Sequence, residues 1–480
     1  MSPHSEIPKE VYPYIINGQD ITTNPYPVTN HQNDLIHHFA SISLKDDSID
    51  QLTVNAKEGF HEWSSISINE KIKIFEKVKE NILNKRSELF KGHSEIGGPD
   101  WFANFNVDGC LGQLQEYISQ LSRSPGEIVQ SSHSDLAMTF KEPVGPVLSI
   151  SPWNAPVILA GRSIIAPLAA GCSVIVKSSE KSPKTAYILV KCFLDAGIPS
   201  KALQLVHVKP EENPSFIDKV LKTGIIKKVN FTGSTIVGKK IAEVCGKNLI
   251  PYLLELGGKN ISIVLNDANL KSASGKILFG AWAHKGQICM STDKVFIDEN
   301  IYDEFKKQII ETAEGFSKDK DHQICQRDTI GRDKVIDLVE DALNKGANLV
   351  FGTFNKEEIL NSNIIQPIIL ENVTSKMDIN SIETFGPVFT LHKFKDVQDV
   401  VKEINDHDYG LKGSVWSTNI IKALKIARQL EIGGVHINAP TVHDEPTVPH
   451  GGVKSSGLGR FNSHWGMDEF QITKTITINE

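Results

Sequence analysis

From Val144 onward, short apolar runs alternate with helical segments and turns rich in Gly or Pro. The first series runs through VGPVLSI, CSVIVK, ALQLVHV, VNFT and YLLEL, and such runs separated by helices predict a parallel sheet covered on both faces. A second series follows residue 289, through KVFID, ANLVFG, IIQPIIL and VFTLHKF. It predicts a second α/β unit of about 180 residues.

The remaining segments predict helices and a few separate strands. Residues 48–95 and 102–121 have helical periodicity, and IINGQDI is typical of a hairpin. Residues 126–143 predict two strands around the turn HSD, and EFQITKTITIN alternates like a half-buried strand. These strands either form an arm that pairs with another subunit or close the sheet of their own chain.

Bulk properties exclude several classes of partner. A net charge of −7 over 480 residues gives no reason to expect binding to nucleic acid or to an anionic membrane. Prolines and Arg162 interrupt the most apolar segment, 144–176, and MSPHSEIPKEVYPY lacks the pattern of a secretory signal. The six cysteines show neither CxxC nor zinc-ligand spacing, so we expect a cytoplasmic protein without a metal site.

Three stretches carry residues suited to nucleophilic catalysis. Cys289 in KGQICMST is either a nucleophile or one more buried cysteine. Asn154 in SPWNAP follows a predicted strand, where its amide either donates to an oxyanion or caps the next helix. Glu255 in LELGGKN sits in an apolar setting that predicts a pKa raised toward neutrality, as suits a general base.

Other strand ends carry residues suited to a dinucleotide. Lys177 and Glu180 in IVKSSE are placed to bind a ribose, or they are ordinary charges of a solvated loop. Gly233 and Ser234 in FTGSTIVG precede a helix whose N-terminus can bind a pyrophosphate, although they also suit a plain capped helix. In SIETFGPVF, Glu383 could bind a hydroxyl pair and Phe385 could pack on a ring. Alternatively, Glu383 is a surface acid and Phe385 a core aromatic.

In this order, SPWNAP, IVKSSE, FTGST, LELGGK, GQIC, ETFGPV and GGVKSSGLGR resemble the aldehyde dehydrogenase superfamily. The resemblance implies a Rossmann-like NAD-binding domain (1–124 and 143–255) and an α/β catalytic domain (256–465). It also implies a small β arm (125–142 and 466–480) that builds a homodimer or homotetramer. The implied cofactor is NAD, because Glu180 would repel the ribose phosphate of NADP. NADP stays possible, since the family includes members that use both.

The resemblance also assigns roles to these residues. Cys289 becomes the nucleophile that forms a thiohemiacetal and then a thioester with the aldehyde, Asn154 the oxyanion donor and Glu255 the base that activates water. Relatives that transfer the acyl group to coenzyme A typically lack this glutamate, so hydrolysis to the carboxylic acid is implied. The implied cofactor-binding residues are Ser151, Trp153, Lys177, Glu180, Gly233, Ser234, Leu256, Glu383 and Phe385.

A narrower similarity concerns the substrate. FNVD, WNAPVILAGRSIIAPLA, GQICMST and INAPTVHDEPTVPHGGVK look most like the salicylaldehyde, benzaldehyde and vanillin dehydrogenase branch. Arg162 would contact an aromatic substrate or form an interdomain salt bridge. The alternatives are a broad-specificity or aliphatic aldehyde dehydrogenase and, from another class, a non-catalytic binding homologue. The implied substrate residues are Trp101, Phe105, Ile158, Arg162, Ile288, Met290 and His450.

Two departures from the family pattern lie close to these motifs. His450 stands where the family usually has Phe in Pro-Phe-Gly-Gly, and His284-Lys285 stands where Asn-Gln is usual. Positive charge at 284 and 285 would lower the pKa of Cys289 if these side chains face it. If they point elsewhere, the pKa is unaffected.

Overall fold

A computed structural model describes residues 10–30, 33–316 and 326–480, so Cys325 lies outside the described residues. Its first sheet has eight strands, of which the five central ones are parallel, as predicted. In spatial order the strands are β22 (Gly457–Leu458), β12 (Tyr252–Glu255), β11 (Lys228–Thr232), β8 (Val147–Ile150), β9 (Val174–Lys177), β10 (Leu203–Val206), β2 (Tyr14–Ile16) and β3 (Gln19–Ile21). β2 and β3 form the predicted hairpin.

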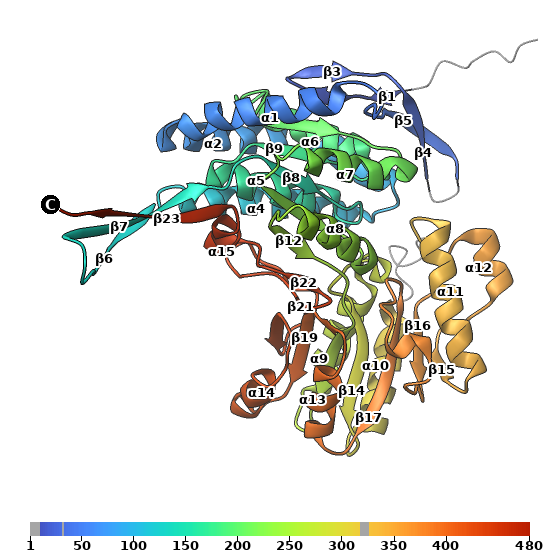
Figure 1. The fold of residues 1–480 in the computed structure, drawn as a ribbon. Coiled ribbons are helices and arrows are strands. Elements are labelled where there is room, and N and C mark those ends of the chain that lie inside the picture. The colour runs from blue at the N-terminus through green and yellow to red at the C-terminus, as the bar shows by residue number, and fades with distance from the viewer. Residues whose placement is uncertain (1–9, 31–32, 317–325) are drawn as a thin grey trace, which may run out of the picture.

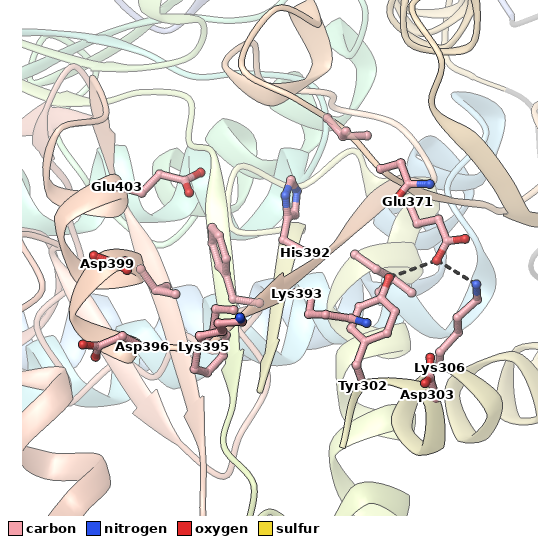
Figure 2. A pocket seen from close by; sticks show the side chains of 16 residues that line it. Tyr302, Asp303, Lys306, Glu371, His392, Lys393, Lys395, Asp396, Asp399 and Glu403 are labelled. Atoms are coloured by element: carbon pink, nitrogen blue, oxygen red, sulfur yellow. Dashed lines mark hydrogen bonds and ion pairs between the residues drawn. The ribbon is translucent and has the colours of Figure 1, made fainter. Parts of the chain in front are cut away.

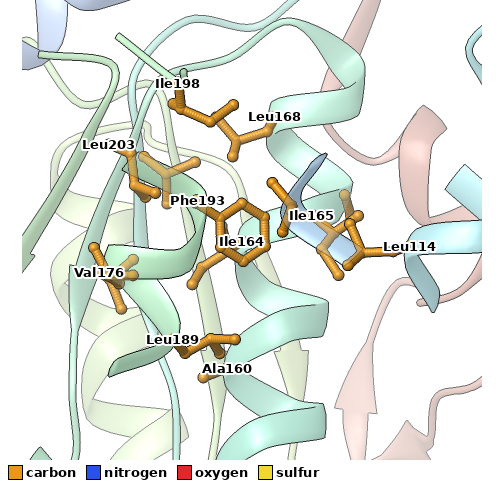
Figure 3. Close-up of a cluster of buried hydrophobic side chains, with 14 of the residues drawn as sticks. Leu114, Ala160, Ile164, Ile165, Leu168, Val176, Leu189, Phe193, Ile198 and Leu203 are labelled. Carbon is orange, nitrogen blue, oxygen red and sulfur yellow. The ribbon is translucent and has the colours of Figure 1, made fainter. Parts of the chain in front are cut away.

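Helices cover both faces of this sheet (Figure 1). Along β9, Val174 and Val176 join one apolar cluster, whereas Ile175 joins the cluster on the opposite face. Figure 3 shows the first cluster, in which Ile164, Leu189 and Phe193 meet between two helices and the sheet. The helices are α1 (Ser48–Ser65), α2 (Ile68–Asn84), α3 (Arg86–Glu95), α4 (Asp100–Gln120), α5 (Pro156–Ala170), α6 (Pro183–Leu194), α7 (Asn213–Lys222), α8 (Thr235–Lys247) and α15 (Ser463–Asp468).

The second α/β unit lies below the first in Figure 1. Its sheet orders β15 (Asn348–Phe351), β16 (Ile368–Glu371), β17 (Val388–Phe394), β14 (Thr292–Asp298), β13 (Asn260–Val264), β19 (Lys412–Trp416) and β20 (Gly434–Ile437). All neighbours are parallel except β15 and β16. Its helices are α9 (Leu270–Trp282), α10 (Tyr302–Phe316), α11 (Thr329–Asn344), α12 (Lys356–Ser362), α13 (Val397–Asn405) and α14 (Ile420–Ala427).

Three strands project from the body as a separate sheet (Figure 1). They are β6 (Gly126–Val129), β7 (Leu136–Pro143) and β23 (Gln471–Ile478), all antiparallel. The strands were predicted, but the half-buried character of the last one was not correct. Phe470 is buried, whereas Ile472, Ile476 and Ile478 are 51%, 42% and 49% exposed, because no layer from the described part of the chain covers these side chains.

Smaller elements complete the described part of the chain. They are β1 (Val11–Tyr12), β4 (Pro25–Thr29), β5 (Leu35–Ala40), β18 (Tyr409–Gly410), β21 (Val453–Lys454) and three short 3-10 helices, η1 (Pro210–Glu212), η2 (Ala283–Gly286) and η4 (Asp378–Asn380). None of the helices among the described residues has the length and apolar character that a bilayer crossing requires.

Candidate active site

The carboxyl ends of β8, β9, β11 and β12 meet at one edge of the first sheet, because parallel strands end on the same side. Four of the motifs singled out in the sequence follow these strands, so the fold brings them together. Cys289 reaches this edge from the second α/β unit, on the loop between α9 and β14.

The backbone before Cys289 is held in an unusual conformation. His284, Lys285 and Gly286 have φ of 47°, 60° and 69°, three consecutive left-handed residues. The Lys285 ammonium donates to the carbonyl of Gly97 (2.8 Å), and the His284 ring stacks on Phe102 at a centroid distance of 4.5 Å. Both side chains therefore point away from the thiol.

Cys289 and Asn154 lie in the walls of two cavities at once. The first, the aromatic cavity, has a volume of about 70 Å³. The second, the strand-end cavity, has about 210 Å³ and opens along the edge of the first sheet. The aromatic cavity is lined by Phe102, Phe105, Asn154, Ala155, Ile158, Leu159, Arg162, Ile288, Cys289, Met290, Val442, Asp444 and His450.

Asn154 is buried and does not cap the following helix, whose N-cap residue is Ala155. Its amide nitrogen donates to the carbonyl of Gln287 at 2.9 Å, two residues before the cysteine. This hydrogen bond fixes an amide N–H donor beside Cys289, as stabilisation of an oxyanion requires.

Glu255 is part of a charged cluster that also contains Arg162, Asp444 and His450. Arg162 Nη2 lies 3.3 Å from Glu255 Oε2, and its Nη1 lies 3.4 Å from Asp444 Oδ2. His450 Nε2 lies 3.6 Å from Glu255 Oε1, and its Nδ1 lies 3.7 Å from Asp444 Oδ1. The guanidinium therefore bridges the two α/β units, as the salt-bridge alternative predicted, while it also lines the aromatic cavity.

The charged cluster corrects the predicted pKa of Glu255. Burial raises the pKa of this carboxyl, but His450 and Arg162 stabilise the carboxylate, and the net effect is a pKa below the usual range. The prediction failed because the apolar neighbours in the sequence say nothing about cations brought in from other elements.

The cysteines differ in their surroundings. Burial, and then the negative charge of Glu255, raise the pKa of Cys289 well above its usual value, so the thiol is protonated at rest. Burial also raises the pKa to about 12 in the other free cysteines of the described residues, which are fully buried: Cys110, Cys172, Cys192 and Cys245. Among these five, Cys289 alone is not classed as buried.

Five of the predicted cofactor residues line the strand-end cavity: Trp153, Gly233, Ser234, Glu383 and Phe385. Ser151, Lys177, Glu180 and Leu256 lie at or just beyond the ends of the same parallel strands, outside this wall. The three predicted catalytic residues Asn154, Glu255 and Cys289 also line it. Sequence reasoning did not single out the other lining residues, of which Thr232 and Gly257 lie within quoted motifs and Lys334 lies on α11 without any local signal.

The strand-end cavity suits a dinucleotide. Ser234 is the N-cap of α8 and makes no capping hydrogen bond with its side chain, so the backbone donors of the first turn stay available. A Cβ on Gly233 would come within 2.5 Å of the Phe231 ring, so only glycine allows this turn to pass so close. These residues fit a pyrophosphate group that approaches the backbone.

Six of the seven predicted substrate residues line the aromatic cavity. The exception is Trp101, whose ring packs against Phe102 and Phe279 instead. The sequence missed Phe102, Ala155, Leu159, Val442 and Asp444. Phe102 was within reach of prediction, since it lies three residues from Phe105 on the same helix, whereas Val442 and Asp444 lie in an irregular segment without periodicity.

A larger hollow of about 780 Å³ lies between α10, β17 and α13 of the second unit (Figure 2). In its wall, Glu371 accepts from Tyr302 (3.0 Å) and from Lys306 (2.7 Å). It contains none of the predicted site residues, so size alone does not identify the active site here.

Glu383 makes stability depend on pH. Burial raises the pKa of this carboxyl from 4.5 to about 7, although its Oε1 accepts from the Gly258 N–H (3.1 Å). The fold favours the protonated form, so the free energy of unfolding should fall as pH rises from 4.5 to about 7. Replacing Glu383 by Gln should stabilise the protein at pH 8 by up to roughly 3 kcal/mol, at about 1.4 kcal/mol per pKa unit, and little at pH 4.

Denaturant unfolding of Glu383→Gln and the native protein at both pH values measures this effect. Glu62→Gln, at an exposed position on α1, serves as control and should show no such difference. Equal stabilities of Glu383→Gln and the native protein at pH 8 would contradict the prediction.

Comparison with known proteins places this site in a family. Residues 19–476 match the aldehyde dehydrogenase family. A salicylaldehyde dehydrogenase of Pseudomonas sp. (strain C18) is 35% identical over 432 residues, 88% of each chain, and a vanillin dehydrogenase of Pseudomonas fluorescens is 33% identical over 97% of each.

The crystal structure of a salicylaldehyde dehydrogenase from Pseudomonas putida G7, complexed with salicylaldehyde, superposes with a TM-score of 0.94 at 31% identity, covering 98% of each chain. A betaine aldehyde dehydrogenase from Staphylococcus aureus in complex with NAD+ does so with a TM-score of 0.91 at 26% identity, covering 98% of this chain and 94% of that one. On this evidence the chain belongs to the aldehyde dehydrogenase family, as its motifs predicted.

Proposed function

We propose that this chain oxidises neutral aromatic aldehydes to carboxylic acids, with NAD as cofactor and NADP as a possible substitute. The observation that carries the proposal is the aromatic cavity beside Cys289, whose wall combines Phe102 and Phe105 with aliphatic side chains. Phe105 is 46% exposed and lies at the outer end, where an entering ring meets it first.

Cys289 is the proposed nucleophile. Glu255 lines the same cavity wall as Cys289 and raises the pKa of its thiol, so it is placed to take the thiol proton and leave a thiolate that attacks the aldehyde carbon. The Asn154 amide donates to the oxyanion that forms on the former carbonyl oxygen. A dinucleotide bound in the strand-end cavity would accept the hydride that leaves the former aldehyde carbon, and the thiohemiacetal on Cys289 would thereby become a thioester.

Once the proton taken from the thiol has been released to solvent, Glu255 acts as the general base for hydrolysis of the thioester. Its oxygen accepts a proton from water, and the resulting hydroxide attacks the thioester carbon and releases the acid. The family relatives that bind NAD+ and the fit of Gly233 and Ser234 support the cofactor assignment. In this proposal Lys177, Glu180 and Glu383 bind the riboses, and Trp153 and Phe385 flank the nicotinamide.

Arg162 favours a neutral substrate. Some relatives at 32% identity are succinate-semialdehyde dehydrogenases. Succinate semialdehyde carries a carboxylate, and binding a carboxylate in a buried cavity requires a cationic side chain that is free to pair with it. In this chain the guanidinium already contacts both Glu255 and Asp444, so its charge is satisfied within the protein. The rest of the aromatic cavity is mostly apolar, which suits a benzaldehyde-like ring.

Substrate preference tests the proposal directly. We expect kcat/KM for NADH formation to be at least tenfold higher with salicylaldehyde, vanillin and benzaldehyde than with hexanal, glycolaldehyde or succinate semialdehyde, or about 1.4 kcal/mol of transition-state binding. Phe102→Ala should reduce the preference by removing the ring wall, whereas Phe279→Ala, which does not line the cavity, should not. A tenfold advantage for hexanal or glycolaldehyde would instead indicate a broad-specificity or aliphatic enzyme.

We further propose the division into a cofactor domain (1–124, 143–255), a catalytic domain (256–465) and an oligomerisation arm (125–142, 466–480). The exposed isoleucines of β23 support the arm, because a partner subunit would cover them. A homodimer or homotetramer follows, which sedimentation velocity on the full chain distinguishes from a monomer. Four buried free thiols suit a reducing compartment, so we propose the cytoplasm.

A further inference from the structure

The Arg162 side chain is held on three sides. Nη2 lies 3.3 Å from Glu255 Oε2, Nη1 lies 3.4 Å from Asp444 Oδ2, and the guanidinium carbon lies 4.2 Å from the centre of the Phe461 ring. The side chain is only 1% exposed, so these contacts replace water around its charge. A planar guanidinium that is paired through two of its nitrogens has little freedom to turn.

The two carboxylate oxygens of Glu255 have different surroundings. Oε2 pairs with Arg162, whereas Oε1 accepts no hydrogen bond from the described residues. Glu255 lines the strand-end cavity together with Cys289, and Arg162 lines the aromatic cavity, whose wall also includes Cys289. One oxygen is therefore anchored from the substrate side, and the other stays available to accept a proton.

Asp444 holds the guanidinium from the other α/β unit. Its Oδ1 accepts from Asn462 Nδ2 at 2.7 Å while its Oδ2 faces Arg162, so the Asp444 carboxylate is itself oriented. Arg162 and Glu255 lie on α5 and β12 of the first unit, whereas Asp444 follows β20 of the second. The thiol of Cys289 also comes from the second unit, so this ion pair connects the base to the unit that carries the nucleophile.

We propose that Arg162, oriented by Asp444, is a positioning residue that holds Glu255 ready to accept a proton from water during hydrolysis of the acyl-enzyme. The inference rests on the proposed function, in which Glu255 is the base for this step. Arg162 cannot itself serve as the base, because a guanidinium has no free lone pair and stays charged. It acts through the carboxylate, by fixing its place and by keeping it ionised.

The charge of Arg162 extends the pH range in which Glu255 acts as a base. Burial raises the pKa of this carboxyl, and contacts with His450 and Arg162 bring it below the usual range. The ionised base is present above that pKa, so removal of the guanidinium should raise the pKa and cost the base at acidic pH. The other titratable and charged groups around the ion pair, from each element packed there, are Tyr117 on α4, Cys289, Asp444 and His450 on loops, and Lys412 on β19.

A pH jump on the acetyl-enzyme tests this role apart from attack by the thiol. p-Nitrophenyl acetate at pH 9 acetylates Cys289 without a cofactor, and the acetyl-enzyme is then mixed into buffers between pH 5.5 and pH 9. Quenched-flow mass spectrometry follows the loss of the acetyl group, so that only subunits able to react are counted. The native rate should change little over this range, because the Glu255 carboxyl ionises at lower pH.

Arg162→Gln should slow hydrolysis at least fivefold at pH 9, because the carboxylate is no longer oriented. It should also introduce a decline toward acidic pH, with a midpoint at least one pH unit above that of the native protein. Arg162→Lys should recover part of this pH shift, since an ammonium restores the charge without the planar fork. Asp444→Asn should slow hydrolysis at every pH without an upward shift, because the cation stays beside Glu255 and a negative charge is lost. A packing defect would not separate the two positions in this way.

Arg86→Gln is the matched control, because Arg86 pairs with Asp108 (2.7 Å) between α3 and α4, and it should keep the native rate and pH profile. A native rate and profile in Arg162→Gln, or an equal upward shift in Asp444→Asn, would overturn the positioning role. Glu255→Gln separates this failure from that of the proposed function. Hydrolysis at the native rate in that variant would show that Glu255 is not the base, and a native protein that takes up no acetyl group would contradict the proposed nucleophile.

Discussion

Cys289→Ala is expected to abolish aldehyde oxidation, with a loss in kcat on the order of 10⁴-fold or more, because no other group takes over a covalent step. NAD affinity should change little, since the cofactor residues proposed above lie on other segments. NADH formation in a spectrophotometer and NAD binding by calorimetry measure the two quantities.

Cys192→Ala is the matched control for this substitution. Cys192 is 2% exposed on α6, and its thiol is far from ionisation, with a pKa near 12. It should retain the activity of the native protein within about twofold, since the change removes one small buried atom. Oxidation that persists in Cys289→Ala would rule out the cysteine mechanism.

Glu255→Gln is expected to lower kcat by about 10²- to 10⁴-fold, the range typical for loss of a general base. Stopped-flow measurements with an aromatic aldehyde should still show a burst of NADH at alkaline pH, where the thiol loses its proton without Glu255, because acylation precedes the step that needs water activation. The amide also removes a negative charge beside the thiol. Cys289 should therefore be alkylated by iodoacetamide at lower pH than in the native protein, since Glu255 raises the pKa of that thiol.

For this interpretation to hold, kcat must fall in Glu255→Gln while the rate of Cys289 alkylation at a given pH rises. A slower turnover together with slower alkylation would point to a disturbed fold rather than a lost base. Arg162 keeps Asp444 as a partner at 3.4 Å in this variant, so its charge does not become isolated. An unchanged kcat would exclude Glu255 as the base.

The sequence predicted the fold well where local pattern determines structure. The alternation of apolar runs and helices predicted both parallel sheets, because a strand covered on both faces must be apolar throughout. It also predicted that residues following different strands would gather, since parallel strands end at one edge. The superfamily resemblance then connected this edge with Cys289, which lies on the other α/β unit.

Features that depend on distant partners were beyond local reasoning. The lowered pKa of Glu255 depends on Arg162, 93 residues away in the chain, and on His450 from a loop close to the C-terminus. The wall residues Val442 and Asp444 lie in an irregular segment, where no periodicity marks which side faces a cavity. The exposure of Ile472 and its neighbours reflects the absence of a packed layer, which alternation within one strand cannot reveal.

The aromatic cavity and the strand-end cavity have Asn154, Leu159 and Cys289 in common, and their other lining residues differ. Substitutions that reshape one wall therefore leave most of the other wall untouched. The substrate range of such an enzyme can therefore change through substitutions at positions such as Phe102, Ile158 or Val442, while the cofactor-binding residues stay the same. For protein engineering, the residues that line only the aromatic cavity can be varied together while the wall of the strand-end cavity is kept unchanged.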